Sequence, residues 1–279
     1  MKKISRRSFL AAAGLSVATL ALTACGGSAS SVASSVASSA ASSAAASTSA
    51  AAGELTTVEA GKLTMATNAA FPPYEMTTDA GDFEGIDIET AQAIADKLGL
   101  ELQIDDMDFD AALLSVQQGK ADIVMAGVTV TDERKAVMDF SDSYATGIQS
   151  IIVPEGSDIA SPDDLAGKKI GTQRGTTGYI YCSDDFGDEN VVAYDDGLTA
   201  VQALNNGQVD AVVIDNAPAK EFVAANPGLV ILDTSYAEED YAIGVAKGSS
   251  LKDAVNAALE ELKADGTLQS IVDKYITAE

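Results

Sequence analysis

Histidine and tryptophan are absent from this 279-residue sequence, and cysteine occurs only twice. Without histidine, a Ser-His-Asp triad, a Cys-His nucleophile pair and a histidine-ligated zinc site are excluded. Cys25 and Cys182 lie on opposite sides of a long Ser/Ala tract, so we treat each as unpaired. The Asp-rich segment 105–110 lacks the glycine and the final glutamate of a calcium loop. We expect no metal and no cofactor.

Positive charge is also scarce, with 17 Lys and Arg against 42 Asp and Glu and a formal net charge of −25. Such a surface repels phosphate backbones, so nucleic-acid binding is not expected. No apolar run of about 18 residues follows the N-terminal region, so nothing downstream is predicted to span a membrane. The length allows one large or two ordinary domains.

The N-terminal residues 1–24 have the pattern of an export signal, with a basic start and an apolar run over 9–24. Arg6 and Arg7 fit the twin-arginine route, and the general secretory route also tolerates them. Leu22-Thr23-Ala24-Cys25 resembles a lipobox, which implies lipidation of Cys25 and anchoring on the outer face of the cytoplasmic membrane. A buried cysteine in an uncleaved helix is the alternative. Residues 25–54, rich in Ser and Ala, are predicted to be a flexible tether.

From Lys62 onward, strand-like and helix-like segments alternate, which predicts a mostly parallel α/β sheet divided into two lobes. The predicted strands cover residues 62–67, 101–104, 122–126, 169–172, 211–214, 229–232 and 242–246. The predicted helices cover residues 87–98, 110–118, 199–206 and 217–225, followed by two C-terminal helices. A Gly/Thr-rich turn is expected after 172.

Several motifs occur in an order that resembles the family 3 extracellular solute-binding proteins of polar amino-acid ABC importers. They lie at residues 66–74, 83–89, 107–109, 126–134, 139–141, 164–168, 175–178, 210–215 and 262–268. The resemblance covers about residues 60–276. It implies a periplasmic-binding-protein-like α/β fold with two lobes, two crossover hinge strands and a ligand cleft between the lobes.

Placed on this sequence, the resemblance implies a first lobe of 55–146 plus 242–279 and a second lobe of 150–237. The hinges would lie near Ala145–Gln149 and Ala237–Ala242. Such hinges permit closure around a ligand. We expect a monomer.

A free amino acid presents a carboxylate and an ammonium, so a site for it needs a cation and an anion. Beyond the signal only Arg134 and Arg174 remain as arginines, and Arg134 offers a planar fork matched to a carboxylate. The resemblance places Arg134 on the ligand α-carboxylate. It implies that backbone N–H groups and one threonine hydroxyl of the first lobe also bind this carboxylate, together with a threonine of the second lobe. These additional residues are Gly127, Thr129, Thr176 and Thr177. Arg134 in a surface ion pair is the alternative.

Asp215 matches the family acid that accepts the α-ammonium, and it could also cap the helix that follows. Phe71 and Phe109 match rings that sandwich the ligand side chain, and core packing is their alternative role. Asn68 and Gln173 match positions that tune the side-chain pocket. Because Asn68 is neutral where relatives for cationic ligands carry an acid, we expect a polar uncharged ligand. An acidic side chain, favoured by Arg174, is the alternative.

The resemblance implies a lipid-anchored receptor that delivers a polar amino acid to an ABC-transporter permease and catalyses nothing. The alternative is a cyclohexadienyl or arogenate dehydratase-like enzyme on the same fold, for which Glu75 is an ordinary acid candidate. A sensory ligand-binding module is a third interpretation, but no transmembrane helix or signalling domain is predicted.

Overall fold

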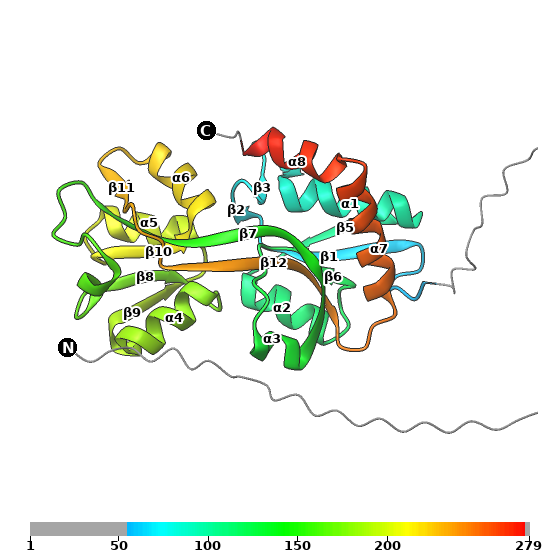
Figure 1. The fold of residues 1–279 in the computed structure, drawn as a ribbon, viewed down its shortest axis with the longest axis horizontal. Helices are drawn as coiled ribbons and strands as arrows, with labels where there is room; N and C mark the ends of the chain where they lie inside the picture. The colour runs from blue at the N-terminus through cyan, green and yellow to red at the C-terminus, as the bar shows by residue number, and fades with distance from the viewer. Residues whose placement is uncertain (1–54, 277–279) are drawn as a thin grey trace, which may run out of the picture. The chain divides into compact units, whose positions relative to one another are not determined.

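The structure is a computed structural model that describes residues 55–276. The predicted export signal, the tether and Cys25 lie outside these residues. Figure 1 shows the described part as two lobes of strands and helices joined by two long strands. In this part of the chain, no helix combines the length and apolar character needed to cross a membrane.

The first lobe is built from both ends of the described chain. Its elements are β1 (Lys62–Thr67), β2 (Ala70–Phe71), β3 (Glu75–Thr77), β4 (Phe83–Glu84), α1 (Ile86–Leu98), β5 (Glu101–Asp106), α2 (Phe109–Gln117), β6 (Ile123–Val124), α3 (Asp132–Val137), α7 (Leu251–Ala264) and α8 (Thr267–Tyr275). Helix α1 ends because Gly99 takes a left-handed conformation, with φ 69°, and its N–H bonds back to the last turn. The fully buried Leu63 and Met65 of β1 belong to a core that also includes Ile94 of α1.

The second lobe lies between the two long strands in the sequence. Its elements are η1 (Pro162–Leu165), β8 (Ile170–Gln173), α4 (Thr177–Phe186), η2 (Asp188–Asn190), β9 (Val191–Tyr194), α5 (Gly197–Asn205), β10 (Ala211–Asp215), α6 (Asn216–Ala225) and β11 (Leu229–Ile231). The sequence predicts a turn where α4 begins, because Thr177 and Gly178 lower helix propensity. Burial against the sheet forms the helix nonetheless. Cys182 of α4 is free, as predicted, and it is buried.

Two strands cross from one lobe to the other, β7 (Met138–Pro154) and β12 (Ala237–Ala246). They pair with each other from Met138 opposite Ala246 to Gln149 opposite Ala237. One sheet therefore runs through both lobes in the order β5-β1-β6-β12-β7-β10-β8-β9, with β11 also on β7. The predicted lobe and hinge boundaries stay predictions, although the predicted hinge segments lie within these paired strands.

The prediction of a mostly parallel sheet holds only within each lobe. Strands β5, β1 and β6 are parallel, as are β10, β8 and β9. Every pairing made by β7 or β12 is antiparallel, because these strands connect the lobes rather than following a helical crossover. The sheet is consequently mixed.

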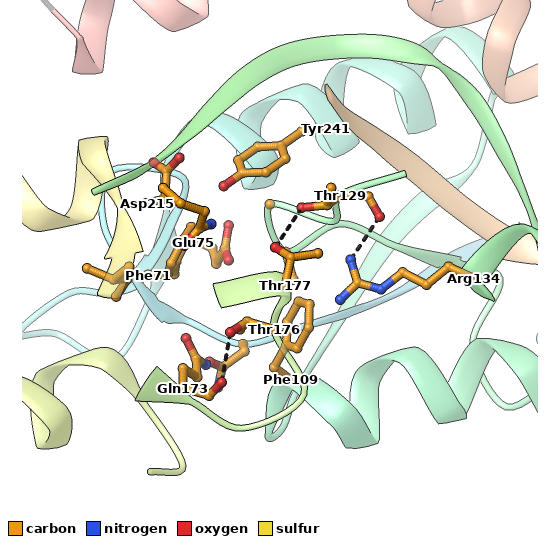
Figure 2. Close-up of a pocket in the computed structure, with 15 residues that line it drawn as sticks. Phe71, Glu75, Phe109, Thr129, Arg134, Gln173, Thr176, Thr177, Asp215 and Tyr241 are labelled. Carbon is orange, nitrogen blue, oxygen red and sulfur yellow. Dashed lines mark hydrogen bonds between the residues drawn. The ribbon is translucent and has the colours of Figure 1, made fainter. Parts of the chain in front are cut away.

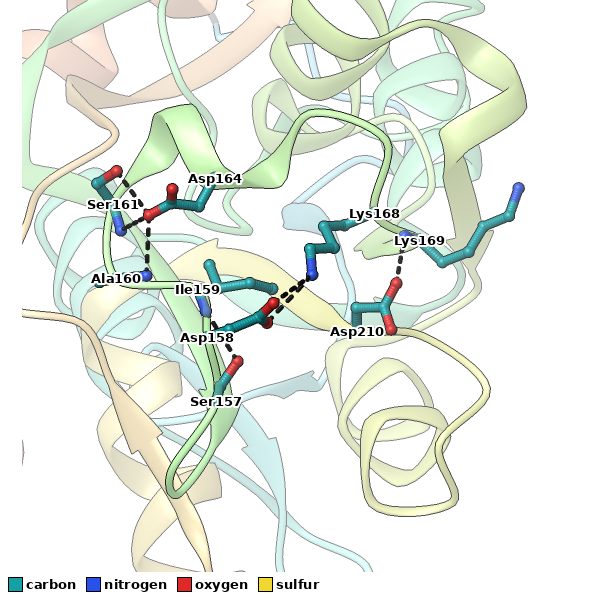
Figure 3. A network of polar contacts seen from close by, with 9 residues as sticks. All are labelled: Ser157, Asp158, Ile159, Ala160, Ser161, Asp164, Lys168, Lys169 and Asp210. Carbon is teal, nitrogen blue, oxygen red and sulfur yellow. Dashed lines mark hydrogen bonds and ion pairs between the residues drawn. The ribbon is translucent and has the colours of Figure 1, made fainter.

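The motif at 164–168 builds a loop rather than a binding surface (Figure 3). The Asp164 carboxylate accepts hydrogen bonds from the N–H groups of Ala160 and Ser161 and from the Ser161 hydroxyl. The ammonium of Lys168 pairs with Asp158 at 3.0 Å. These contacts stabilise the loop that connects β7 to β8, and none of these residues lines the pocket described next.

Candidate functional site

One pocket is lined by every residue that the sequence nominates for ligand binding. The nominated residues are Asn68, Phe71, Phe109, Gly127, Thr129, Arg134, Gln173, Thr176, Thr177 and Asp215. Figure 2 shows most of these side chains directed toward a shared space. The loops and strand ends of both lobes bring them together, although more than a hundred positions separate the first from the last. Their individual roles toward a ligand stay predictions.

Arg134 is a buried cation held in place from several directions. Its backbone N–H bonds to the Thr131 hydroxyl, which caps α3. The guanidinium donates to the carbonyls of Thr129 at 2.8 Å and Gly175 at 3.1 Å. Its carbon lies 5.4 Å from the centroid of the Phe109 ring.

Within the described residues Arg134 forms no ion pair with a carboxylate, although only 8% of it is exposed. Burial lowers the pKa of Arg134, and the negative charge of Glu239 opposes that change. A buried guanidinium has a strong preference for a neutralising anion. The site is thus suited to a carboxylate ligand.

Thr129 connects the two lobes beside this cation. Its hydroxyl oxygen lies 3.4 Å from that of Thr177, at the start of α4, and donates to Glu239 of β12 at 3.1 Å. Gln149 of β7 donates to the same Glu239 oxygen at 3.0 Å. Gln149 of β7 thus lines the pocket, and the buried Glu239 of β12 holds Thr129 and Gln149 from behind.

The Gly127 N–H does not face the pocket. We predicted it to help hold a carboxylate, but it donates to Asp87 at 3.0 Å. The Gly127 φ of +54° and the lack of a side chain explain the glycine, because a Cβ there would lie 3.0 Å from the Phe71 ring and 3.2 Å from Tyr241. Gly127 thus shapes the wall and lets the two rings approach.

Thr176 and Gln173 form the adjoining edge of the second lobe. The Thr176 hydroxyl donates to the Gln173 carbonyl at 2.8 Å and accepts from the Tyr179 N–H, which caps α4. The Gln173 amide donates to Asn68 at 2.8 Å, and the Asn68 amide donates to the Met107 carbonyl at 2.9 Å. Asn68 and Gln173 are neutral, buried and in contact across the lobes.

Asp215 serves as a helix cap and also faces the pocket. Its carboxylate accepts from the Ala217 N–H at 2.9 Å, at the start of α6, and from the Ile148 N–H of β7 at 2.7 Å. Burial raises its pKa to about 6, and these two hydrogen bonds oppose the rise. The sequence left capping and ligand contact as alternatives, and the geometry permits both.

Sequence reasoning did not assign Glu75, Gln149 or Tyr241 to the ligand site, yet all three line it. Glu75 is completely buried, and no hydrogen-bond donor in the described part of the chain reaches its carboxylate. A charged residue directly after the apolar Phe-Pro-Pro-Tyr turn was a usable signal for Glu75. Gln149 and Tyr241 had no such signal, because only the pairing of β7 with β12 brings them to the pocket.

Residues 63–278 match the family of bacterial extracellular solute-binding proteins, family 3. The L-cystine-binding protein TcyJ of Escherichia coli K12 is 33% identical over 226 residues, covering 79% of this chain and 85% of that protein.

Two solved structures of an ancestral arginine-binding protein are also similar. The form bound to glutamine has 42% identity and a TM-score of 0.75, covering 78% of this chain and 99% of that one. The form bound to arginine has 43% identity and a TM-score of 0.74, covering 77% and 98%. The two-lobed fold implied by the motifs is confirmed, and this chain belongs to the family 3 bacterial extracellular solute-binding proteins.

Proposed function

We propose that this protein is an amino-acid receptor that binds one polar amino acid between its lobes and delivers it to an ABC-transporter permease. The observation that carries the proposal is the presence in one pocket of a buried guanidinium, Arg134, and a buried carboxylate, Asp215. Arg134 has no carboxylate partner among residues 55–276. Figure 2 shows these two groups on different sides of the pocket. An amino acid carries the complementary pair of charges on one carbon.

In this arrangement Arg134 holds the ligand α-carboxylate through a charge-assisted, bidentate contact. The hydroxyls of Thr129, Thr176 and Thr177 complete that contact, with Gly127 shaping the wall. Asp215 accepts the α-ammonium. Because its pKa of about 6 reflects burial, the arriving ammonium favours its charged form.

The ligand side chain would extend between Phe71 and Phe109 toward the amides of Asn68 and Gln173. Similar proteins are named as binders of cystine, arginine and glutamine, all polar amino acids. Neutral amides at Asn68 and Gln173 favour a neutral polar side chain. The ligand class that we propose is therefore a polar amino acid.

The chain is not an enzyme, since its family and its similar proteins are binding proteins. We further propose export through the signal of residues 1–24, lipid anchoring at Cys25 and a tether over 25–54. The folded part would then act as a monomer outside the cytoplasmic membrane, consistent with an extracellular family.

Thermal-shift screening of the mature protein against the twenty amino acids tests the function directly. A ligand at 100 times its Kd adds about 2.7 kcal/mol to the free energy of unfolding, which is a readily measured rise in Tm. We expect one or a few polar amino acids to give this rise. Stabilisation by none of the twenty would contradict the proposal, as would equal stabilisation by the matching amines that lack a carboxylate.

A further inference from the structure

Two acidic side chains are buried against each other beneath the pocket. Glu75 of β3 and Asp87 of α1 both have 0% exposure. The two residues are neighbours in the fold, because the Asp87 N–H donates to the carbonyl of Tyr74, the residue before Glu75, at 2.8 Å. Each of the two acids changes the pKa of the other. Neither forms an ion pair with a cation among the described residues. Glu75 also lines the ligand pocket, whereas Asp87 lies behind it.

The available donors are shared unequally between the two groups. One Asp87 oxygen accepts the Gly127 N–H at 3.0 Å and the Tyr144 O–H at 2.7 Å. In the described part of the chain, the other Asp87 oxygen and both Glu75 oxygens have no donor. Two facing carboxylates cannot bond each other unless one carries a proton. Since Asp87 already has two donors, the proton is best placed on Glu75.

The charged and titratable neighbours favour the same arrangement. Glu75 feels the negative charges of Asp87 on α1 and Asp106 on β5. Two tyrosines also lie near the pair of acids: Tyr74, the residue before Glu75, and Tyr144 of β7. None of these groups is a cation. Burial raises the pKa of Glu75 well above its usual value, and the negative charge of Asp87 raises it further. Burial also raises the pKa of Asp87, to about 6.

We propose that Glu75 and Asp87 hold one proton between them and that a ligand with a cationic side chain displaces it, whereas a neutral polar side chain leaves it in place. The Glu75 O–H bond breaks and the proton passes to the solvent buffer. The positive charge of the ligand then replaces the charge of the proton, so both complexes have the same total charge in the pocket. This inference rests on the proposed amino-acid receptor function and specifies the ligands of that site.

A definite pH dependence follows. If binding releases a proton, lowering the pH weakens binding, by up to about tenfold in Kd per pH unit for one full proton. Arginine should therefore bind more tightly as the pH rises from 6 to 8. Glutamine should show a smaller dependence, because it leaves the Glu75 proton in place. Any proton exchanged at Asp215 is common to both ligands, since both carry the same α-ammonium.

Titration calorimetry of the mature protein with arginine and with glutamine provides the test. Measurements in phosphate and in Tris, whose ionisation enthalpies differ, give the number of protons released by each ligand. We expect arginine to release about one proton more than glutamine at pH 7. Equal release by both ligands would overturn the inference while leaving the receptor function intact. Failure of arginine to bind between pH 6 and 8 would also overturn it.

The Glu75→Gln variant identifies the group that releases the proton. The amide side chain introduced at position 75 has the shape of a protonated glutamate but cannot ionise. The difference in proton release between the two ligands, arginine and glutamine, should therefore disappear. The ratio of the two affinities should move toward glutamine by about tenfold or more. Glu84→Gln, at an exposed acid on the neighbouring strand β4, is the control and should retain the wild-type difference.

If Glu75→Gln does not fold, Asp87→Asn gives an independent answer. It removes the negative charge that raises the Glu75 pKa, so arginine should bind at pH 7 with less proton release than in wild type. Unchanged proton release in Asp87→Asn would overturn the inference. If none of the twenty amino acids binds the wild-type protein, the receptor function fails, and the inference fails with it.

Discussion

The guanidinium of Arg134 lies 3.1 Å from the carbonyl oxygen of Gly175, so the pocket cation of the first lobe is hydrogen-bonded to the loop before α4 in the second lobe. Thr129 with Thr177, and Asn68 with Gln173, make further contacts between the lobes. The described arrangement is therefore closed over the pocket. Entry of a ligand requires these contacts to separate, and the paired crossover strands are the connections about which the lobes can rotate.

Arg134→Ala should abolish most of the ligand affinity. The change removes a charge-assisted contact in a closed pocket and leaves the ligand carboxylate without its partner, which costs about 2–5 kcal/mol in binding free energy. Titration calorimetry with the ligand found by thermal-shift screening measures this loss. Arg174→Ala is the control, because Arg174 is exposed and pairs with exposed Asp195. Equal effects of the two substitutions would place the carboxylate site elsewhere.

Glu239→Gln should weaken the closed arrangement. One Glu239 oxygen accepts from both Thr129 and Gln149, and replacing the carboxylate by a neutral amide removes the negative charge that strengthens both bonds. We expect a cost of about 1–3 kcal/mol, seen as a faster ligand off-rate and as a larger open population by fluorescence energy transfer between the lobes. Glu238→Gln, on the exposed side of the same strand, is the matched control. Closure unaffected by Glu239→Gln would contradict this assignment.

The ligand-free protein should lose stability as the pH rises from about 4.5 to 7.5. Burial raises the pKa of Asp87 and of Asp215 to about 6, and that of Glu75 well above its usual value. In this range the folded state holds protons that the unfolded chain has released, so the free energy of unfolding falls with increasing pH. Acids with lowered pKa values, such as Asp139, act in the opposite sense, at lower pH.

Denaturant titrations at several pH values and constant ionic strength measure this slope. Glu75→Gln should flatten it, whereas Glu84→Gln should not. If the free energy of unfolding changed equally with pH in the wild type, Glu75→Gln and Glu84→Gln, Glu75 would not be protonated in the folded state.

Asn68→Asp should shift ligand preference toward arginine, lysine or ornithine. The new carboxylate would pair with a cationic side chain and remain unpaired with a neutral one, a swing of about 1–3 kcal/mol. The variant also loses the hydrogen bond that Asn68 donates to the Met107 carbonyl, so its Tm should fall. Competition calorimetry ranks the ligands. An unchanged ranking would show that residue 68 does not meet the ligand side chain.

Cys25→Ala should prevent lipid attachment and release the protein from the membrane fraction. Ligand binding should persist, because the pocket is built from residues 68–241. Metabolic labelling with a fatty acid, followed by fractionation, measures both effects. Label retained by the mutant would rule out Cys25 as the lipidation site.

Local sequence determined much of the fold. Strand β1 covers Lys62–Thr67 as predicted, and α1 begins one residue earlier than predicted and ends before Gly99. Here the apolar period and a glycine stop signal act within a few residues, so no distant contact is needed to interpret them. The ordered motifs also located the nominated pocket residues, because a family resemblance carries long-range information that periodicity lacks.

Only the tertiary structure decided which groups meet across the chain. It extended β12 back to Ala237 and paired it with β7, which brought Gln149 and Tyr241 to the pocket. It directed the Gly127 N–H to Asp87 and buried Glu75 beside that acid, with no hydrogen-bond donor from the described residues. The physical reason is that hydrogen-bond partners and solvent exclusion depend on which distant segments pack together. The presence of a carboxylate at one position of the sequence predicts neither its partners nor its burial.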